Sequence, residues 1–174
     1  MSGAAALAVR ELEARDLDAY KALRDHALAH HEEAFTSDAP TEARRSALSY
    51  ASRLGGDGTG GFTLGAFRGD ALVGAITLER DPRTKVRHVG HVIGTMVYAD
   101  EIGRGVGRAL LDALIERAAA DDELQSLTLT VTAGNAAAER LYARAGFTVF
   151  GTQPRAIRVG DRYFTKQHMV LNLK

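Results

Sequence analysis

The chain has 174 residues, contains no cysteine, and carries 22 basic and 22 acidic side chains, so that its formal net charge is zero. This length favours one domain, spanning residues 1–174, with room for a substantial core. The balanced charge argues against nucleic acid or an anionic membrane as the main partner. The lack of cysteine excludes disulfides, thiolate metal sites and a cysteine nucleophile.

The N-terminal segment has neither a basic leader nor a long apolar stretch, so no signal peptide is indicated. No uncharged apolar run is long enough to cross a bilayer. We therefore expect a cytoplasmic protein.

Short elements are predicted for the first third of the chain. Residues 7–12 are typical of a strand, and a helix with an acidic first turn runs from 16 to about 29. A polar loop at 30–40 leads to a second helix at 41–54. The glycine-rich stretch 55–61 is interpreted as a flexible connector, because no strand precedes it and no helix follows it.

Strands dominate the middle of the chain. Residues 62–68 and 71–80 are predicted to form a hairpin, and a further strand runs from 87 to 97. A glycine-containing turn then leads into a helix. Its apolar residues recur at helical spacing, at Val106, Leu110, Leu114 and Ala118.

In the last third, leucine or valine alternates with threonine over residues 127–132, which indicates a half-exposed or ligand-facing strand. Asn135 is a good N-cap for an alanine-rich helix at 136–145. Two more strands are predicted, at 147–153 and 168–173. Helices that precede or interrupt a series of strands predict an α/β layer with a mixed sheet.

The turn with glycines at 103, 105 and 107 is the most informative stretch. A glycine-rich turn that opens a helix leaves backbone N–H groups unpaired at the positive end of the helix dipole, so we expect a phosphate-bearing cofactor. A Walker A loop would end in Gly-Lys-Ser/Thr, which is absent here. The Rossmann fingerprint would need a glycine at Arg108.

Residues 102–111, Ile-Gly-Arg-Gly-Val-Gly-Arg-Ala-Leu-Leu, resemble instead the acetyl-CoA signature of the GNAT superfamily of N-acyltransferases, Gln/Arg-x-x-Gly-x-Gly/Ala. Gly105 and Gly107 match this signature, and Ile102 replaces its polar first residue. Residues 135–147 resemble the other GNAT signature, Asn-x-x-Ala-x-x-x-Tyr-x-x-x-Gly-Phe, and residues 151–173 resemble the final hairpin of the family.

The resemblance implies the GNAT fold, which is of the α/β (α+β) class. Its mixed, mostly antiparallel sheet has six or seven strands and about four flanking helices, and it is splayed between the fourth and fifth strands. Acetyl-CoA would bind in that opening as cosubstrate, without a metal. The coenzyme-binding residues implied are Met96, Val97, Ile102, Gly103, Arg104, Gly105, Val106, Gly107, Arg108, Asn135 and Tyr142.

The resemblance also implies catalytic roles. The main chain at Met96 and Val97, which we expect to be free of ladder partners, would bond the acyl or pantetheine carbonyls in the manner of an oxyanion hole. Tyr142 matches the tyrosine that gives its proton to the coenzyme A thiolate; a core tyrosine bonded to a backbone carbonyl is the alternative. His91 stands where histone-acetylating members carry a catalytic glutamate, and imidazole suits a general base. Glu79, Glu33 and a water chain are alternatives.

The sequence therefore predicts an N-acetyltransferase that moves acetyl from acetyl-CoA to a primary amine of a small molecule, peptide or protein, by direct attack in a ternary complex. The alternatives are a coenzyme A-binding module without catalysis and a mononucleotide-binding domain. Members of the family often dimerise, so a homodimer is among the expected states. The helices and loops that would bind the acceptor carry mixed charges, so the sequence favours neither a cationic nor an anionic acceptor. His26 and His30 lie one helical turn apart, but no third metal ligand is near them in sequence.

Overall fold

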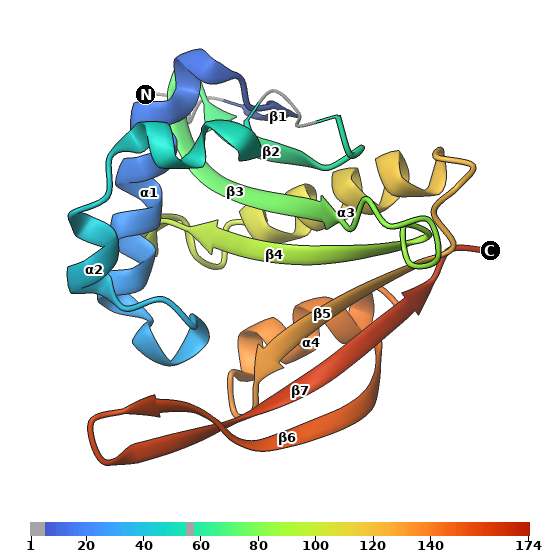
Figure 1. The fold of residues 1–174 in the computed structure, drawn as a ribbon. Coiled ribbons are helices and arrows are strands. Elements are labelled where there is room, and N and C mark those ends of the chain that lie inside the picture. Colours follow the sequence, from blue (N-terminus) through green and yellow to red (C-terminus); the bar gives the residue numbers. More distant parts are fainter. Residues whose placement is uncertain (1–5, 55–57) are drawn as a thin grey trace.

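The computed structural model describes residues 6–54 and 58–174. Its seven strands form one sheet in the order β1-β2-β3-β4-β5-β7-β6 (Figure 1). All neighbouring strands are antiparallel except β4 and β5. The strands are β1 (Leu7–Glu11), β2 (Phe62–Arg68), β3 (Ala71–Arg80), β4 (Val89–Val97), β5 (Ser126–Thr132), β6 (Thr148–Val159) and β7 (Arg162–Asn172).

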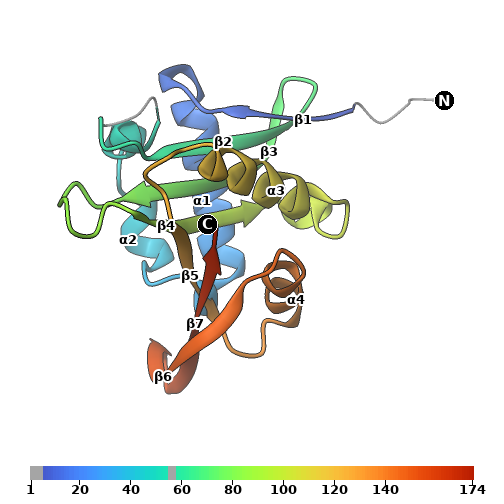
Figure 2. The same cartoon turned by 90° about the vertical axis from the view of Figure 1, so that its right-hand side faces the viewer.

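Four α-helices and four short 3₁₀ helices are found among the described residues. The α-helices are α1 (Leu17–His30), α2 (Ala39–Ala43), α3 (Val106–Ala119) and α4 (Ala136–Arg144). The 3₁₀ helices are η1 (Ala14–Asp16), η2 (Glu32–Ala34), η3 (Ala47–Arg53) and η4 (Ala99–Glu101). Figure 2 shows α1 and α3 on opposite faces of the strands β2 to β4.

Each face of the sheet has its own apolar core. On one face, Leu110, Leu111 and Leu114 of α3 are fully buried against β2 to β5. On the other, Leu23 of α1 and Tyr50 of η3 pack against residues of β2, β3 and β4. Each large apolar side chain buried in this way contributes about 1.5–3 kcal/mol relative to exposure. The two cores hold β4 in place from both sides.

The sheet opens between β4 and β5, as predicted. The two strands pair in parallel only where Val89–His91 face Ser126–Thr128, and they diverge beyond that point (Figure 1). Gly94 has a φ of 58°, and the register between β3 and β4 shifts where Ala75 and Thr77 oppose this part of β4. A bulge of this kind bends a strand. It lies where β4 turns away from β5.

The structure confirms several predicted elements: the first strand, the first helix, the β2–β3 hairpin, α3 and the helix capped by Asn135. The predicted helix at 41–54 is wrong, because it is two elements, α2 and η3. Asp38 caps α2 and Pro40 lies in its first turn, so this helix begins before residue 41. It ends at Ala43, and η3 begins separately at Ala47. The final strands are longer than predicted.

Residues 55–57 of the predicted connector lie outside the described residues. In the part of the chain that the structure describes, no helix is both long and apolar enough to span a membrane.

Candidate active site

A cavity of about 1140 Å³ lies along the opening between β4 and β5. It is lined by the end of β4, the turn before α3, the first turns of α3 and α4, and the loop around η2. Nine of the predicted coenzyme-binding residues line it together: Met96, Val97, Ile102, Gly103, Gly105, Val106, Gly107, Arg108 and Asn135.

The N-terminus of α3 faces this cavity. Gly105 is the N-cap with a φ of 82°, and Gly103 has a φ of 80°. A β-carbon at either position would meet nothing within 4 Å, so the requirement for glycine comes from the backbone conformation and not from crowding. The first α-helical bond runs from the Ala109 N–H to the Gly105 carbonyl, at 3.0 Å. The N–H groups of residues 106–108 therefore precede the helical ladder and are available to an anion.

An ion pair holds the turn before α3. Glu101 is buried, and its carboxylate accepts from Arg68 Nε at 2.8 Å and from Arg104 Nη1 at 3.4 Å. The hydrogen bond from Arg68 is the main reason why the pKa of Glu101 is lowered. Arg104, a predicted coenzyme contact, thus pairs with Glu101. The sequence analysis missed the role of Glu101.

The end of β4 offers main-chain donors toward the opening, with one correction to the prediction. Met96 and Val97 are not free of ladder partners, because they pair with Ala75 and Gly74 of β3. Only the edge toward β5 is open. The Tyr98 N–H bonds to a carbonyl of β3, and N–H groups alternate along a strand, so the Val97 N–H points toward the opening.

Tyr142 lies on α4, buried directly behind the cavity lining, with its ring edge-on to Phe147 at a centroid distance of 6.0 Å. Thr95 Oγ1 is also buried and forms no hydrogen bond of normal geometry to any described residue. Burial raises the pKa of the Tyr142 phenol, and the neighbouring Thr95 hydroxyl opposes this effect. Two hydroxyl groups thus meet beside the opening with hydrogen-bonding capacity to spare, which fits a polar ligand.

The first turn of α4 completes the coenzyme side of the cavity. Asn135 Oδ1 accepts from the Ala138 N–H at 3.2 Å, as the predicted cap does. Arg140 and Arg144 of the same helix also line the cavity, as does Arg108 of α3. These two arginines were not predicted. They add positive charge near the α3 N-terminus, where a diphosphate would lie.

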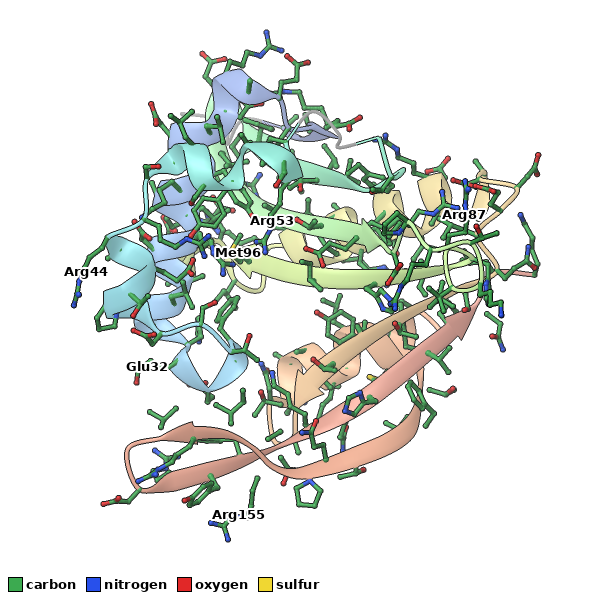
Figure 3. All side chains as sticks on the ribbon, in the orientation of Figure 1. Glu32, Arg44, Arg53, Arg87, Met96 and Arg155 are labelled. Atoms are coloured by element: carbon green, nitrogen blue, oxygen red, sulfur yellow. The ribbon has the colours of Figure 1, made fainter. Side chains whose placement is uncertain are left out.

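The loop around η2 spans the wide end of the opening. Thr132 Oγ1 of β5 donates to the Glu33 carbonyl at 2.7 Å, and Lys166 Nζ of β7 donates to the Ala34 carbonyl at 2.9 Å. Lys166 is only 7% exposed, and burial lowers the pKa of its amine. Figure 3 shows Glu32 at the bottom of this loop, between the strands of the two halves of the sheet. Sequence analysis did not detect either contact.

His91 lies apart from the predicted coenzyme contacts. It lines a second cavity, of about 550 Å³, together with its cross-strand neighbour Glu79. Its Nδ1 is 2.7 Å from Thr128 Oγ1, at the end of β4 that remains paired with β5. The two cavities lie on either side of the bulge in β4. The structure therefore brings Tyr142 close to the coenzyme residues and leaves His91 beyond the bulge.

The rings of the helical histidine pair stack on each other. The rings of His26 and His30 lie 4.0 Å apart, and His26 Nε2 accepts from the Ala99 N–H at 3.4 Å. Burial is the main cause of the lowered pKa of His26. Within residues 6–54 and 58–174, no group of three or more histidine, aspartate or glutamate side chains could hold a metal ion.

Residues 20–147, more than half of the chain, match the acetyltransferase (GNAT) family. The chain belongs to this family. The prediction of an acetyltransferase is thereby confirmed at the level of the family, and the GNAT fold is confirmed by solved structures. A GNAT acetyltransferase from Streptococcus pneumoniae is 25% identical, with a TM-score of 0.82 over 96% of this chain and 99% of that one.

Two other proteins similar to this GNAT chain have ligands or substrates in their names. The structure of yncA from Salmonella typhimurium, with its cofactor acetyl-CoA, has a TM-score of 0.78 and 21% identity, over 98% of this chain and 95% of that one. An L-methionine sulfoximine/L-methionine sulfone acetyltransferase of Pseudomonas paraeruginosa is 39% identical over 77 residues. This match spans 44% of each of the two chains, less than half of the curated relative.

Proposed function

We propose that the protein transfers the acetyl group of acetyl-CoA to a primary amine of a small molecule, peptide or protein, by direct attack in a ternary complex. The observation that carries the proposal is the cavity between β4 and β5. It joins the open N-terminus of α3 to the buried hydroxyl pair of Thr95 and Tyr142. An anion site and a proton donor at the two ends of one opening are what acyl transfer from a coenzyme thioester needs.

The N–H groups of residues 106–108 hold the diphosphate of the cosubstrate, with Arg108, Arg140 and Arg144 around it. Backbone donors dominate at this site, so the replacement of a polar residue by Ile102 in the signature does not abolish binding. Asn135 stays with its helix as a cap through its Oδ1 and presents its side-chain N–H groups to the pantetheine arm.

Acetyl-CoA supplies a thioester whose carbonyl lies within reach of a nucleophile. The acceptor amine forms the new C–N bond while the C–S bond breaks, and a base takes the proton of the amine. The Val97 N–H stabilises the charge that develops on the carbonyl oxygen. Tyr142 gives its proton to the departing thiolate. Burial raises the pKa of its phenol, which favours the protonated form that this role requires. No covalent enzyme intermediate is required.

The base is a side chain that faces one of the two cavities. We assign this role first to His91, acting directly or through water, because an imidazole accepts protons near neutral pH. Glu79 lies beside it in the second cavity, and Glu33 lines the first. The pH dependence of kcat/KM in the variants His91→Ala, Glu79→Gln and Glu33→Gln decides among them, since loss of the base removes the limb of the profile that it controls.

The experiment that tests the proposal is steady-state release of the coenzyme A thiol with a panel of amino acids, polyamines, aminoglycosides and peptides. We expect turnover with at least one amine. Tyr142→Phe should lose turnover and still bind acetyl-CoA. The similarity to an L-methionine sulfoximine/L-methionine sulfone acetyltransferase supports the inclusion of small amino acids in the panel.

Two other functions make different predictions in the same assays. A coenzyme A-binding module would bind acetyl-CoA and show no turnover with any amine. A mononucleotide-binding domain would be stabilised by ATP or NAD and not by coenzyme A. A cytoplasmic location, a homodimer and a single domain over residues 1–174 remain proposals, to be checked by cell fractionation, sedimentation equilibrium and limited proteolysis.

A further inference from the structure

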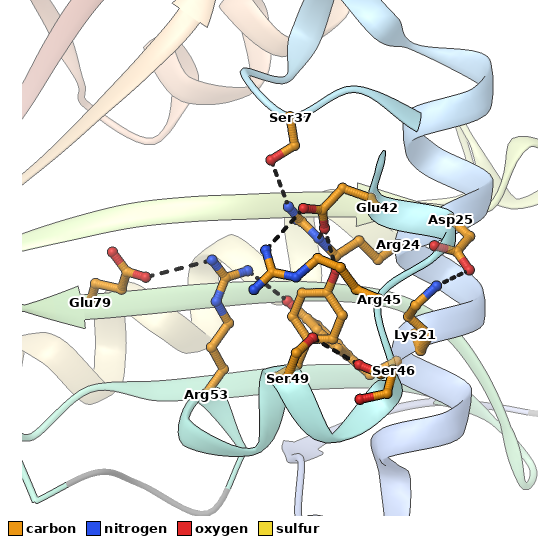
Figure 4. A network of polar contacts seen from close by, with 12 residues as sticks. Lys21, Arg24, Asp25, Ser37, Glu42, Arg45, Ser46, Ser49, Arg53 and Glu79 are labelled. Atoms are coloured by element: carbon orange, nitrogen blue, oxygen red, sulfur yellow. Dashed lines mark hydrogen bonds and ion pairs between the residues drawn. The ribbon is translucent and has the colours of Figure 1, made fainter. Parts of the chain in front are cut away.

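Three arginines surround one tyrosine ring on the α1 face of the sheet. The guanidinium carbons of Arg24, Arg45 and Arg53 lie 5.4, 5.5 and 5.7 Å from the centroid of the Tyr50 ring. The arginines come from α1, from the segment after α2 and from η3, and all three line the second cavity (Figure 4). Cation–π contact with Tyr50 holds the guanidinium groups close together despite their like charge.

Arg24 and Arg45 share a single counter-ion. The buried carboxylate of Glu42 accepts from Arg24 Nε at 2.9 Å, from Arg45 Nη1 at 3.1 Å and from the Tyr50 hydroxyl. Burial alone would raise the pKa of Glu42, but these hydrogen bonds outweigh it and lower the pKa to about 2. Glu42 is therefore ionised and fully engaged, and it cannot also compensate Arg53.

Arg53 forms one ion pair, with Glu79, and this ion pair is long. Its Nη1 lies 3.4 Å from the Tyr20 hydroxyl, and its Nη2 lies 3.9 Å from Glu79 Oε1, too far for a hydrogen bond. Figure 4 shows the Arg53 side chain extending from η3 toward Glu79 along the face of the sheet. A guanidinium group has five donors, so most of those on Arg53 are left for a ligand in the cavity.

The second cavity, which these arginines line, is here called the arginine cavity, and the first, proposed for acetyl-CoA, the coenzyme cavity. The two cavities lie next to each other. On α1, Arg24 lines the former and Ala27, one turn further, lines the latter. In the loop after η2, Ser37 lines the arginine cavity and Phe35 lines the coenzyme cavity. The two cavities thus adjoin along α1 and this loop. A small molecule bound at Arg53 therefore lies on the α1 side of the sheet, next to the cavity proposed for the coenzyme.

We propose that Arg53, assisted by Arg45, binds the carboxylate of the acceptor, so that the substrates are primary amines that carry a carboxylate, as amino acids do. A planar guanidinium matches a carboxylate with two parallel hydrogen bonds. The three guanidinium groups face two carboxylates, Glu42 and Glu79, and the bound carboxylate balances the remaining positive charge. This inference rests on the proposed function and narrows the class of acceptor substrates to amines that carry a carboxylate.

The test compares matched amines that differ only in the carboxylate: L-methionine sulfone with 3-(methylsulfonyl)propylamine, and L-leucine with 3-methylbutylamine. In the wild-type protein we expect kcat/KM to be about tenfold or more higher for the amino acid of each pair. Arg53→Gln should abolish this preference by raising the KM of the amino acids, and Arg53→Lys should restore part of it. Arg44→Gln is the matched control, because Arg44 points away from the protein (Figure 3).

Calorimetric titration of L-methionine sulfone into the coenzyme A complex gives a readout without turnover. Heat is expected from the wild type and Arg44→Gln and not from Arg53→Gln. Three results would overturn the inference while leaving acetyl transfer intact. They are no heat from the wild type, equal kcat/KM for the amino acid and the amine of each pair, and an equal effect of Arg53→Gln on the amino acid and the amine. Failure of acetyl-CoA to bind would instead overturn the proposed function.

Discussion

Arg68 at the end of β2 donates from its Nε to the buried carboxylate of Glu101, at 2.8 Å, although the two residues are far apart in the chain. Glu101 ends η4, directly before the glycine turn. The sheet therefore fixes the start of the turn, whereas Gly103 and Gly105 give the turn its conformation. The pair places the open N–H groups of α3 at a defined distance from β4.

The variant Glu101→Gln should weaken acetyl-CoA binding more than it weakens the fold. A neutral amide cannot replace the charge-assisted bond to Arg68, so the turn loses its anchor to the sheet. We expect Kd for acetyl-CoA, measured by calorimetry, to rise about tenfold. Arg104→Gln removes a longer ion pair to the same carboxylate, from an arginine that is exposed, and should change Kd less than about threefold. Equal effects of the two variants would contradict a special role for Arg68–Glu101.

Two glycine variants separate backbone strain from ligand binding. Gly105 at the start of α3 and Gly160 between β6 and β7 have φ values of 82° and 58°, and neither would crowd an added β-carbon. Both Gly105→Ala and Gly160→Ala should therefore destabilise the fold by about 1–2 kcal/mol in urea unfolding. Only Gly105→Ala should also weaken acetyl-CoA binding. Loss of binding in both, or in neither, would place the coenzyme elsewhere.

The free energy of unfolding should depend on the ionisation of Glu42. Its pKa is lowered from 4.5 to about 2, so its contribution is complete above pH 4.5 and is lost as the pH falls through 2. At pH 7, Glu42→Gln should cost about 3 kcal/mol, because Arg24 stays buried without its partner. The difference between wild type and variant should shrink toward pH 2. A difference independent of pH would contradict the ionised state of Glu42.

Lys166 supports the η2 loop by a bond to the Ala34 carbonyl. In Lys166→Met the bond is lost, and so is the cost of burying an ammonium group, so thermal stability should change by less than about 3 °C. We expect the KM of the acceptor to rise and Kd of acetyl-CoA to stay the same, since the loop lies away from α3. If the affinity for acetyl-CoA fell as well, the loop would contribute to binding of the coenzyme and not only of the acceptor, contrary to this prediction. Steady-state kinetics and calorimetry provide the two values.

Features with a local signal were predictable from sequence. The helical spacing of Val106, Leu110 and Leu114 defined α3, and Asn135 capped α4 as expected. The opening between β4 and β5 came from the resemblance to the GNAT family and not from any pattern in the strands. The extent of β6 and β7 was missed because most β6 side chains are exposed and give no alternation of apolar and polar residues.

Contacts between distant segments could not be predicted. Arg68 with Glu101, Thr132 with Glu33 and Lys166 with Ala34 depend on tertiary proximity, for which a single sequence carries no signal. The arginine cluster around Tyr50 was hidden for the same reason, since the sequence showed only mixed charges. The early start of α2 was in principle detectable, from Asp38 and Pro40.

Calorimetric titration of the protein with acetyl-CoA, and separately with ATP and with NAD, tests the central claim most directly. We expect one acetyl-CoA to bind per chain, its Kd to rise when Gly105 is replaced by alanine, and ATP and NAD to give no measurable heat. Heat from ATP or NAD without heat from acetyl-CoA would contradict this claim. So would acetyl-CoA binding that the Gly105→Ala substitution leaves unchanged.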